Sequence, residues 1–147
     1  MGDIFMVTLS GVVTELYSFT GPDGAYPTTT ISQATNGDFY GTTGGGGDDS
    51  CDPLADGCGV AFSLANNLGP FTAFVRGYGR VGHVVEILGQ GFTGTTAVEF
   101  AGSPAQFSVV SDTYLTATVP SGAATGFVTV ATPTGTLKSN VPFRVLP

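Results

Sequence analysis

The residues able to do chemistry gather around one short acidic loop. Its two cysteines, Cys51 and Cys58, are separated by six residues. An even cysteine count in a loop-rich chain favours a disulfide, with two free thiols as the alternative. The loop also holds four aspartates: Asp48, Asp49, Asp52 and Asp56. Because calcium prefers six to eight oxygen ligands, the loop is a candidate calcium site, and a solvated acidic loop is the alternative.

The sequence offers little for catalysis. His83 is the single histidine, and a catalytic imidazole needs a nucleophile and an orienting acid beside it, so we expect a turn or surface histidine. No G-x-S-x-G motif is present. Two G-x-G-x-x-G matches, at 77–82 and 89–94, precede strand-like patterns, whereas a nucleotide site needs a helix there. We predict a non-enzymatic protein with no cofactor other than the candidate calcium.

Composition predicts an all-β protein of two modules. Charged residues make up 10% of the 147 residues, and 23 glycines and 9 prolines separate recurring apolar runs, which is typical of short strands joined by tight turns. Residues 1–69 carry eight acidic groups and no Lys or Arg, whereas residues 70–147 carry three acidic and four basic groups. This step in charge, and the turn-rich residues 66–70, predict domains at 1–69 and 70–147.

The same composition limits partners and location. A net charge of −7 with four basic residues disfavours nucleic acid, whose binding depends on clustered Lys and Arg. No apolar run approaches the ~18 residues of a membrane helix. The first residues lack the basic and apolar regions of a secretory signal, and we expect the chain to be a piece of a longer protein.

In residues 1–69 we expect strands at 3–9, 12–19, 29–35, 38–43 and 60–65. Asn36-Gly37 is a strong hairpin signal that should fold the third strand onto the fourth. Gly2-Asp3-Ile4-Phe5 is echoed 57 residues later by Gly59-Val60-Ala61-Phe62, as in a repeat array. The pattern predicts one propeller-like blade, entered at its middle.

These residues resemble the GloVer (Gloeobacter–Verrucomicrobium) repeats of large bacterial surface proteins. The resemblance rests on Leu16-Tyr17-Ser18-Phe19, on Asp23-Gly24-Ala25-Tyr26-Pro27 and on residues 33–43. It implies an exported, tandemly repeated unit, often with a cysteine pair at the position of the acidic loop. This chain departs from the family by holding little more than one unit, and a lone blade cannot close a ring.

A lone blade leaves strand edges exposed and is expected to pack against a neighbour. Three neighbours are open: the C-terminal module, another copy of the chain, or further blades of a longer protein. For pairing between copies, we expect the terminal strands to be the edges that associate. Their apolar residues are Ile4, Phe5, Val7, Val60, Phe62 and Leu64.

Residues 70–147 show period-two alternation with frequent turns, which predicts an antiparallel immunoglobulin-like β-sandwich whose last strand lies at 141–145. The glycines at 89 and 91 would let a strand bend while Phe92 enters the core. From Val81 onward the chain resembles an IPT/TIG domain, on residues 82–92, 98–102, 111–120 and 126–130. The resemblance implies an Ig-like spacer or contact module, common in bacterial surface proteins. DNA-binding members of that family use basic loops, and this copy lacks a basic cluster.

The function we predict is that of a structural or adhesive module at the bacterial surface, secreted or surface-bound, that binds copies of itself or neighbouring repeats and assembles a filament by pairing strand edges. The alternative is a carbohydrate-binding accessory region, because several aromatic residues could form a sugar-stacking platform.

Overall fold

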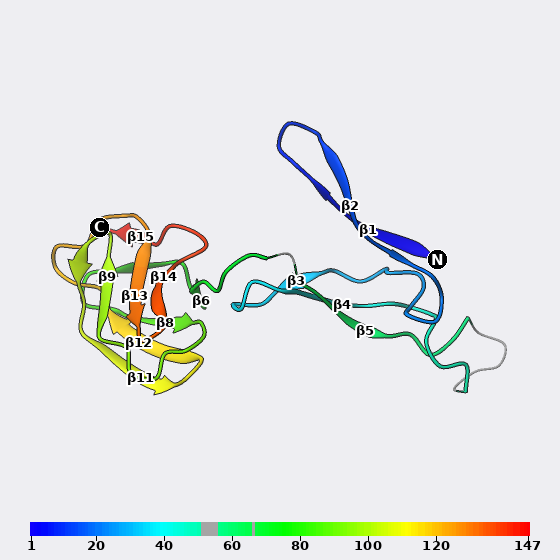
Figure 1. The fold of residues 1–147 in the computed structure, drawn as a ribbon. Helices are drawn as coiled ribbons and strands as arrows, with labels where there is room; N and C mark the ends of the chain where they lie inside the picture. Colours follow the sequence, from blue (N-terminus) through cyan, green and yellow to red (C-terminus); the bar gives the residue numbers. More distant parts are fainter. Residues whose placement is uncertain (51–55, 66) are drawn as a thin grey trace. The chain divides into compact units, whose positions relative to one another are not determined.

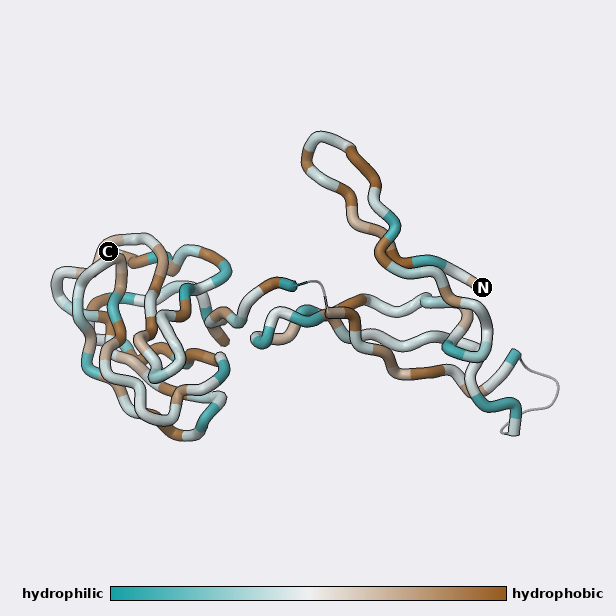
Figure 2. Tube along the Cα trace, viewed as in Figure 1, coloured by the Kyte–Doolittle hydropathy of each residue, from teal (hydrophilic) through white to brown (hydrophobic). Residues whose placement is uncertain are grey.

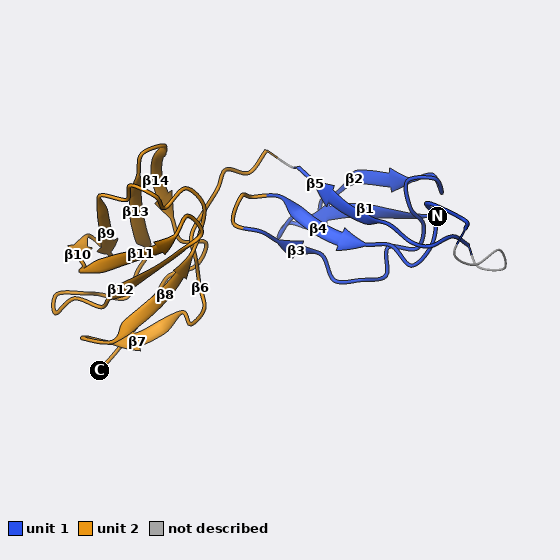
Figure 3. Ribbon diagram, turned by 90° about the horizontal axis from the view of Figure 1, so that it is seen from below, with its two compact units in different colours: residues 1–34, 38–66 blue, residues 35–37, 67–147 orange. Residues whose placement is uncertain are grey.

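The computed structural model describes residues 1–50, 56–65 and 67–147, and every regular element in these ranges is a β-strand (Figure 1). The all-β prediction is therefore confirmed. The chain divides into two compact units (Figure 3). Unit 1 comprises residues 1–34 and 38–66, and unit 2 comprises residues 35–37 and 67–147.

Unit 1 contains two small sheets. An antiparallel hairpin joins β1 (Gly2–Val7) to β2 (Val13–Phe19), and β3 (Ser32–Gln33), β4 (Phe39–Thr42) and β5 (Ala61–Leu64) form a sheet in that order. The antiparallel pairing of β3 with β4 agrees with the hairpin signal, although β3 is much shorter than the expected 29–35.

The single blade predicted for this half differs from the arrangement found. Gly21 and Gly24 exchange two backbone hydrogen bonds of 3.2 and 3.0 Å immediately after β2. In the described residues β2 pairs only with β1, so the segment after this turn does not extend the β1–β2 ladder. The strands divide into a two-stranded and a three-stranded sheet.

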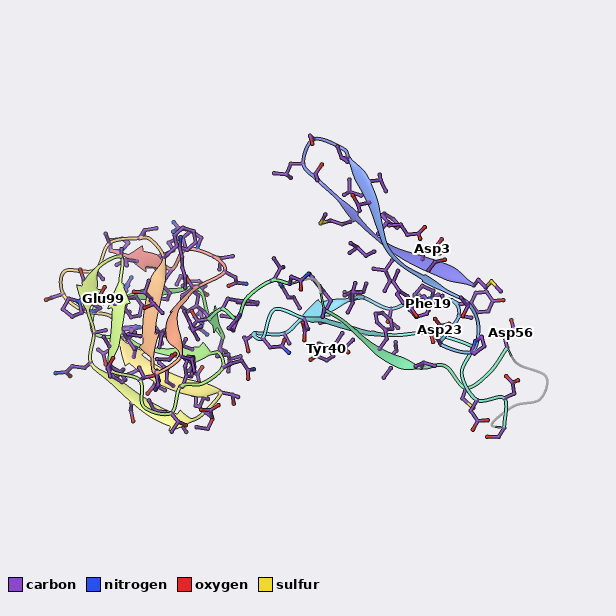
Figure 4. All side chains as sticks on the ribbon, viewed as in Figure 1. Asp3, Phe19, Asp23, Tyr40, Asp56 and Glu99 are labelled. Carbon is purple, nitrogen blue, oxygen red and sulfur yellow. The ribbon has the colours of Figure 1, made fainter. Side chains whose placement is uncertain are left out.

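The core of unit 1 is small and lies at the base of the β1–β2 hairpin. Ile4 and Phe19 are 6% and 2% exposed, and the Phe19 ring meets the Phe62 ring edge-on with centroids 5.3 Å apart. Figure 4 shows Phe19 at this base. The proximal half of the hairpin therefore packs on the face of the sheet that carries Phe62.

The glycine-rich stretch of unit 1 brings backbones into direct contact. Gly46 has a φ of +76°, and a Cβ atom there would lie 2.3 Å from the carbonyl oxygen of Gly21. Only glycine fits both the left-handed backbone and the close approach.

Unit 2 is the Ig-like sandwich that the alternation predicted. Its two main sheets have the orders β10-β9-β13-β14 and β11-β12-β8-β6, and β15 pairs with β7. The strands are β6 (Ala73–Phe74), β7 (Tyr78–Arg80), β8 (Val84–Leu88), β9 (Ala97–Phe100), β10 (Ser103–Pro104), β11 (Phe107–Ser111), β12 (Tyr114–Thr118), β13 (Val128–Thr132), β14 (Gly135–Lys138) and β15 (Arg144–Leu146).

The core of unit 2 lies between these sheets. Along β8, Val85 and Ile87 are buried while their neighbours are exposed. Phe92 is fully buried, and a Cβ atom at Gly89 would lie 2.3 Å from its ring, so glycine leaves room for the aromatic side chain. The predicted entry of Phe92 into the core is confirmed.

The last strand differs from its prediction in position and direction. We expected an antiparallel strand at 141–145, whereas β15 begins at Arg144 and runs parallel to β7, with Arg144 opposite Tyr78. Side chains alternate with period two in both kinds of ladder, so the pattern does not indicate strand direction.

Candidate self-association surface

The distal half of the β1–β2 hairpin is apolar and exposed. Six large apolar side chains on both arms and the connecting turn are between 47% and 111% exposed: Phe5, Met6, Val7, Leu9, Val12 and Val13. Figure 2 shows the hydrophobic colouring of this hairpin. An exposed apolar surface of this kind indicates an interaction site.

The register of the β1–β2 hairpin determines which side chains lie opposite each other and where its bulge lies. Val7 lies opposite Val13, and Phe5 lies opposite Glu15, whereas Ile4 lies opposite Tyr17. Leu16 is skipped by the register, so the bulge is in β2 and β1 is continuous. Because a bulge disrupts an edge, the free edge of β1 is better suited to accept another strand than that of β2.

The second edge belongs to β5, which pairs only with β4 among the strands of the described residues. Its residues Ala61–Leu64 include no charged side chain and no proline. Proteins commonly protect exposed edges with lysine, proline or bulges. The edge of β5 has none of these.

The edges of unit 2 are better protected. β14 carries Lys138, and the pairing of β11 is irregular between Val109 and Ser111. β6 and β10 have two residues each. Within the strands described, the features that favour association are therefore strongest in unit 1.

The structure separates the six predicted edge residues into groups. Ile4 is a core residue, Phe5 and Val7 are exposed at 61% and 53%, and Val60, Phe62 and Leu64 are half-buried on or beside β5. The prediction missed Met6, Leu9, Val12 and Val13. The apolar runs on both sides of Ser10-Gly11 were the signal for these residues.

Polar contacts fix the base of the hairpin. The Tyr17 hydroxyl donates to Asp23 Oδ2 at 2.5 Å, and the Thr20 amide and hydroxyl both donate to Asp23 Oδ1 at 2.8 Å. The Tyr17 hydrogen bond and then those of Thr20 lower the pKa of Asp23 to about 2. The same Asp23 raises the pKa of Tyr17, first by the hydrogen bond and then by its charge. Ionised Asp23 therefore holds the end of β2 to the turn after it.

The acidic loop is only partly described. Cys51 and Asp52 lie outside the described residues, so the disulfide with Cys58 and the four-aspartate calcium site remain predictions. Asp49 and Asp56 line one hollow of about 650 Å³, whereas Asp48 Oδ1 accepts the Ser50 amide at 2.8 Å. In the part of the chain that the structure describes, no three acidic, histidine or cysteine side chains gather in a metal-binding arrangement.

His83 lies in the turn between β7 and β8 and is exposed. Its amide donates to the carbonyl oxygen of Arg80 at 3.0 Å, as expected for a turn residue. His83 and Glu86 line one groove of unit 2, and the Glu86 carboxylate accepts a hydrogen bond from the Tyr114 hydroxyl at 3.0 Å.

No helix in the described residues is long and apolar enough to span a membrane. Comparison with curated proteins gave no match. Among solved structures, an auxiliary nutrient binding protein from Bacteroides ovatus aligns with 52% of this chain at 23% identity and a TM-score of 0.46. A gamma-CGTase from Alkalophilic bacillus clarkii aligns with 77% at 18% identity and a TM-score of 0.45. This chain covers 20% and 23% of those two chains.

None of these comparisons supports the GloVer resemblance of residues 1–69, which stays a prediction. The model of the IPT/TIG domain family matches residues 71–145, just over half of the sequence. This range contains both main sheets of unit 2 and its buried core. The chain therefore belongs to the IPT/TIG domain family.

Proposed function

We propose that this chain is a non-enzymatic structural module of an extracellular bacterial protein, and that copies associate through unit 1. The β1 edge of one copy pairs with the β5 edge of another, joining its two-stranded sheet to a three-stranded one. The exposed apolar half of the β1–β2 hairpin is the observation that carries this proposal. In the same proposal, residues 1–69 are one GloVer-type repeat unit and the IPT/TIG domain holds it at the cell surface.

Three observations support a second copy as the occupant of these edges. The residues of β1 and β5 echo each other in sequence, so each is built for a similar neighbour. Both strands keep one edge without a strand partner in the described residues. A two-stranded hairpin alone is marginally stable in water, whereas a five-stranded sheet has an ordinary size.

Sedimentation velocity over a wide concentration range tests this proposal. The native chain is expected to form dimers and longer assemblies as concentration rises. Val7→Lys places a charge on the β1 surface and removes burial of about 1.5 kcal/mol, so it should weaken association about tenfold or more. Val141→Lys is the matched control, because Val141 is exposed to a similar degree in unit 2, at 49% against 53% for Val7.

Equal effects of the two variants would show that the hairpin is not the contact. A native chain that stays monomeric at millimolar concentration would contradict the proposal outright.

A further inference from the structure

A groove of about 540 Å³ lies in unit 2, lined by residues of the segment 75–80, by residues 83–86 and by Leu146. Its size is within the range of small-ligand sites. The groove lies outside unit 1, so binding of a ligand there does not depend on self-association.

The groove gathers much of the positive charge of the chain. Arg76 and Arg80 are two of its four basic residues, and the single histidine, His83, lines the same groove. One acidic residue, Glu86, also lines it, and Tyr114 already donates to that carboxylate at 3.0 Å. In the described ranges neither guanidinium forms an ion pair with a carboxylate. Two arginines are therefore available to an anion from solution.

An aromatic ring lies beside these charges. Tyr78 is 50% exposed, and the Arg76 guanidinium carbon is 5.6 Å from the centre of its ring. The backbone beneath is fixed, because Tyr78 pairs with Arg144 in the β7–β15 ladder and Phe143 is buried against Gly79. A ring on a rigid strand is a suitable platform for a flat, partly apolar ligand.

We infer that this groove binds a carboxylate-bearing sugar unit of a glycan. Arg76 and Arg80 bind the carboxylate, which guanidinium groups match in geometry and charge. The Tyr78 ring lies against the C–H face of the sugar, and His83 and Glu86 are within the groove to contact its hydroxyl groups.

The number of basic groups decides between kinds of anion. Residues 70–147 carry four basic and three acidic groups, so the two arginines of the groove match one carboxylate but not a polymer that carries a charge on every unit. A glycan in which carboxylates alternate with neutral sugars offers one charge to the groove and an apolar ring face to Tyr78. A phosphate ion offers the charge without the ring face.

Titration of the ¹⁵N-labelled chain with a hyaluronan hexasaccharide, followed by amide chemical shifts, tests this site. Shifts should be confined to residues 75–80 and 83–86. Arg76→Gln and Arg80→Gln should each weaken binding about tenfold, the usual cost of a charged hydrogen bond, and Tyr78→Ala should weaken it too. Lys138→Gln is the control, since it removes the same charge from the surface near Phe127, where the ammonium lies 3.9 Å from the ring centre.

Two further probes complete the test. Neutral chitohexaose should shift the same amides far less than the hyaluronan fragment. Absence of shifts with the hyaluronan fragment, or an equal loss on Lys138→Gln and Arg76→Gln, would overturn the inference. So would a result in which sodium phosphate binds as tightly as the hexasaccharide and Tyr78→Ala changes neither.

Discussion

Asp23 shows how a single surface carboxylate can set the shape of a hairpin. It accepts hydrogen bonds from the Tyr17 hydroxyl and from two donors of Thr20. These contacts join β2 to the turn at Gly21, the point at which the chain leaves the hairpin for the three-stranded sheet. The orientation of the exposed apolar half depends on this base.

Acid is therefore expected to loosen the hairpin base. The pKa of Asp23 is lowered from its ordinary 3.8 to about 2, so its contacts stabilise the fold fully above pH 3.8. This contribution is lost as the pH falls through about 2. A ¹³C titration of the side-chain carboxyl should give a midpoint near 2, and a midpoint near 3.8 would contradict the hydrogen-bonded geometry.

At alkaline pH the same contact is expected to delay ionisation of the Tyr17 hydroxyl. Because Asp23 raises the pKa of Tyr17, Asp23→Asn should return the Tyr17 hydroxyl toward its ordinary ionisation. Ultraviolet titration of the variant should show one tyrosine ionising at lower pH than in the native chain. An unchanged titration curve would show that the two side chains are not in contact.

Glycine at position 46 is the second residue on which unit 1 depends. Gly46→Ala should cost more than about 3 kcal/mol, because the new Cβ atom meets backbone as well as an unfavourable φ. Gly11→Ala is the matched control, with a φ of +82° and no atom within 4 Å, and should cost about 1–2 kcal/mol. Urea unfolding followed by NMR signals of unit 1, with those of unit 2 as internal reference, measures both.

Among the elements, the acidic loop is expected to carry a disulfide between Cys51 and Cys58. Closing a loop of this length contributes about 2–3 kcal/mol in the chain-entropy model. Non-reducing peptide mapping should show one linked peptide whose mass rises by two hydrogens on reduction. Alkylation of both thiols without a reductant would contradict the pairing.

The elements also show what a sequence pattern can and cannot predict. Alternation predicted the strands of the sandwich but not which face is buried, and the structure places Val85, Ile87 and Leu115 in the core. It missed the parallel direction of β15, which depends on where the chain crosses between sheets rather than on side-chain pattern. Asn36-Gly37 correctly indicated a hairpin between β3 and β4, and Gly37 has a positive φ of +100°.

The candidate surface was predictable only in part. Phe5 and Val7 were expected at an edge, and both are exposed, but Ile4 was expected there too and lies in the core. Which face of β1 is covered depends on the packing of Phe19 against Phe62, two residues 43 positions apart. Tyr78 was one of several aromatic residues considered for a sugar-stacking platform, but the groove beside it was not predicted, because it forms where segments 75–80 and 83–86 meet.

At the scale of the whole molecule, charge is divided between the two halves. Residues 1–69 carry eight acidic groups and no Lys or Arg, so copies that meet through unit 1 repel each other. Salt screens this repulsion, with a Debye length of about 10 Å at 0.1 M. Association is therefore expected to strengthen between about 20 and 300 mM NaCl, and sedimentation velocity at fixed protein concentration measures it. Weaker association in salt would indicate contact between opposite charges instead.

Hydrogen exchange at low and high protein concentration tests the central claim most directly, because it reports on the strand edge itself. Association is predicted to slow exchange of amides in Ala61–Leu64 and Gly2–Val7, while Phe107–Ser111 of unit 2 exchanges at the same rate at both concentrations. Unchanged exchange in Ala61–Leu64 in a sample that has assembled would show that copies meet through another surface.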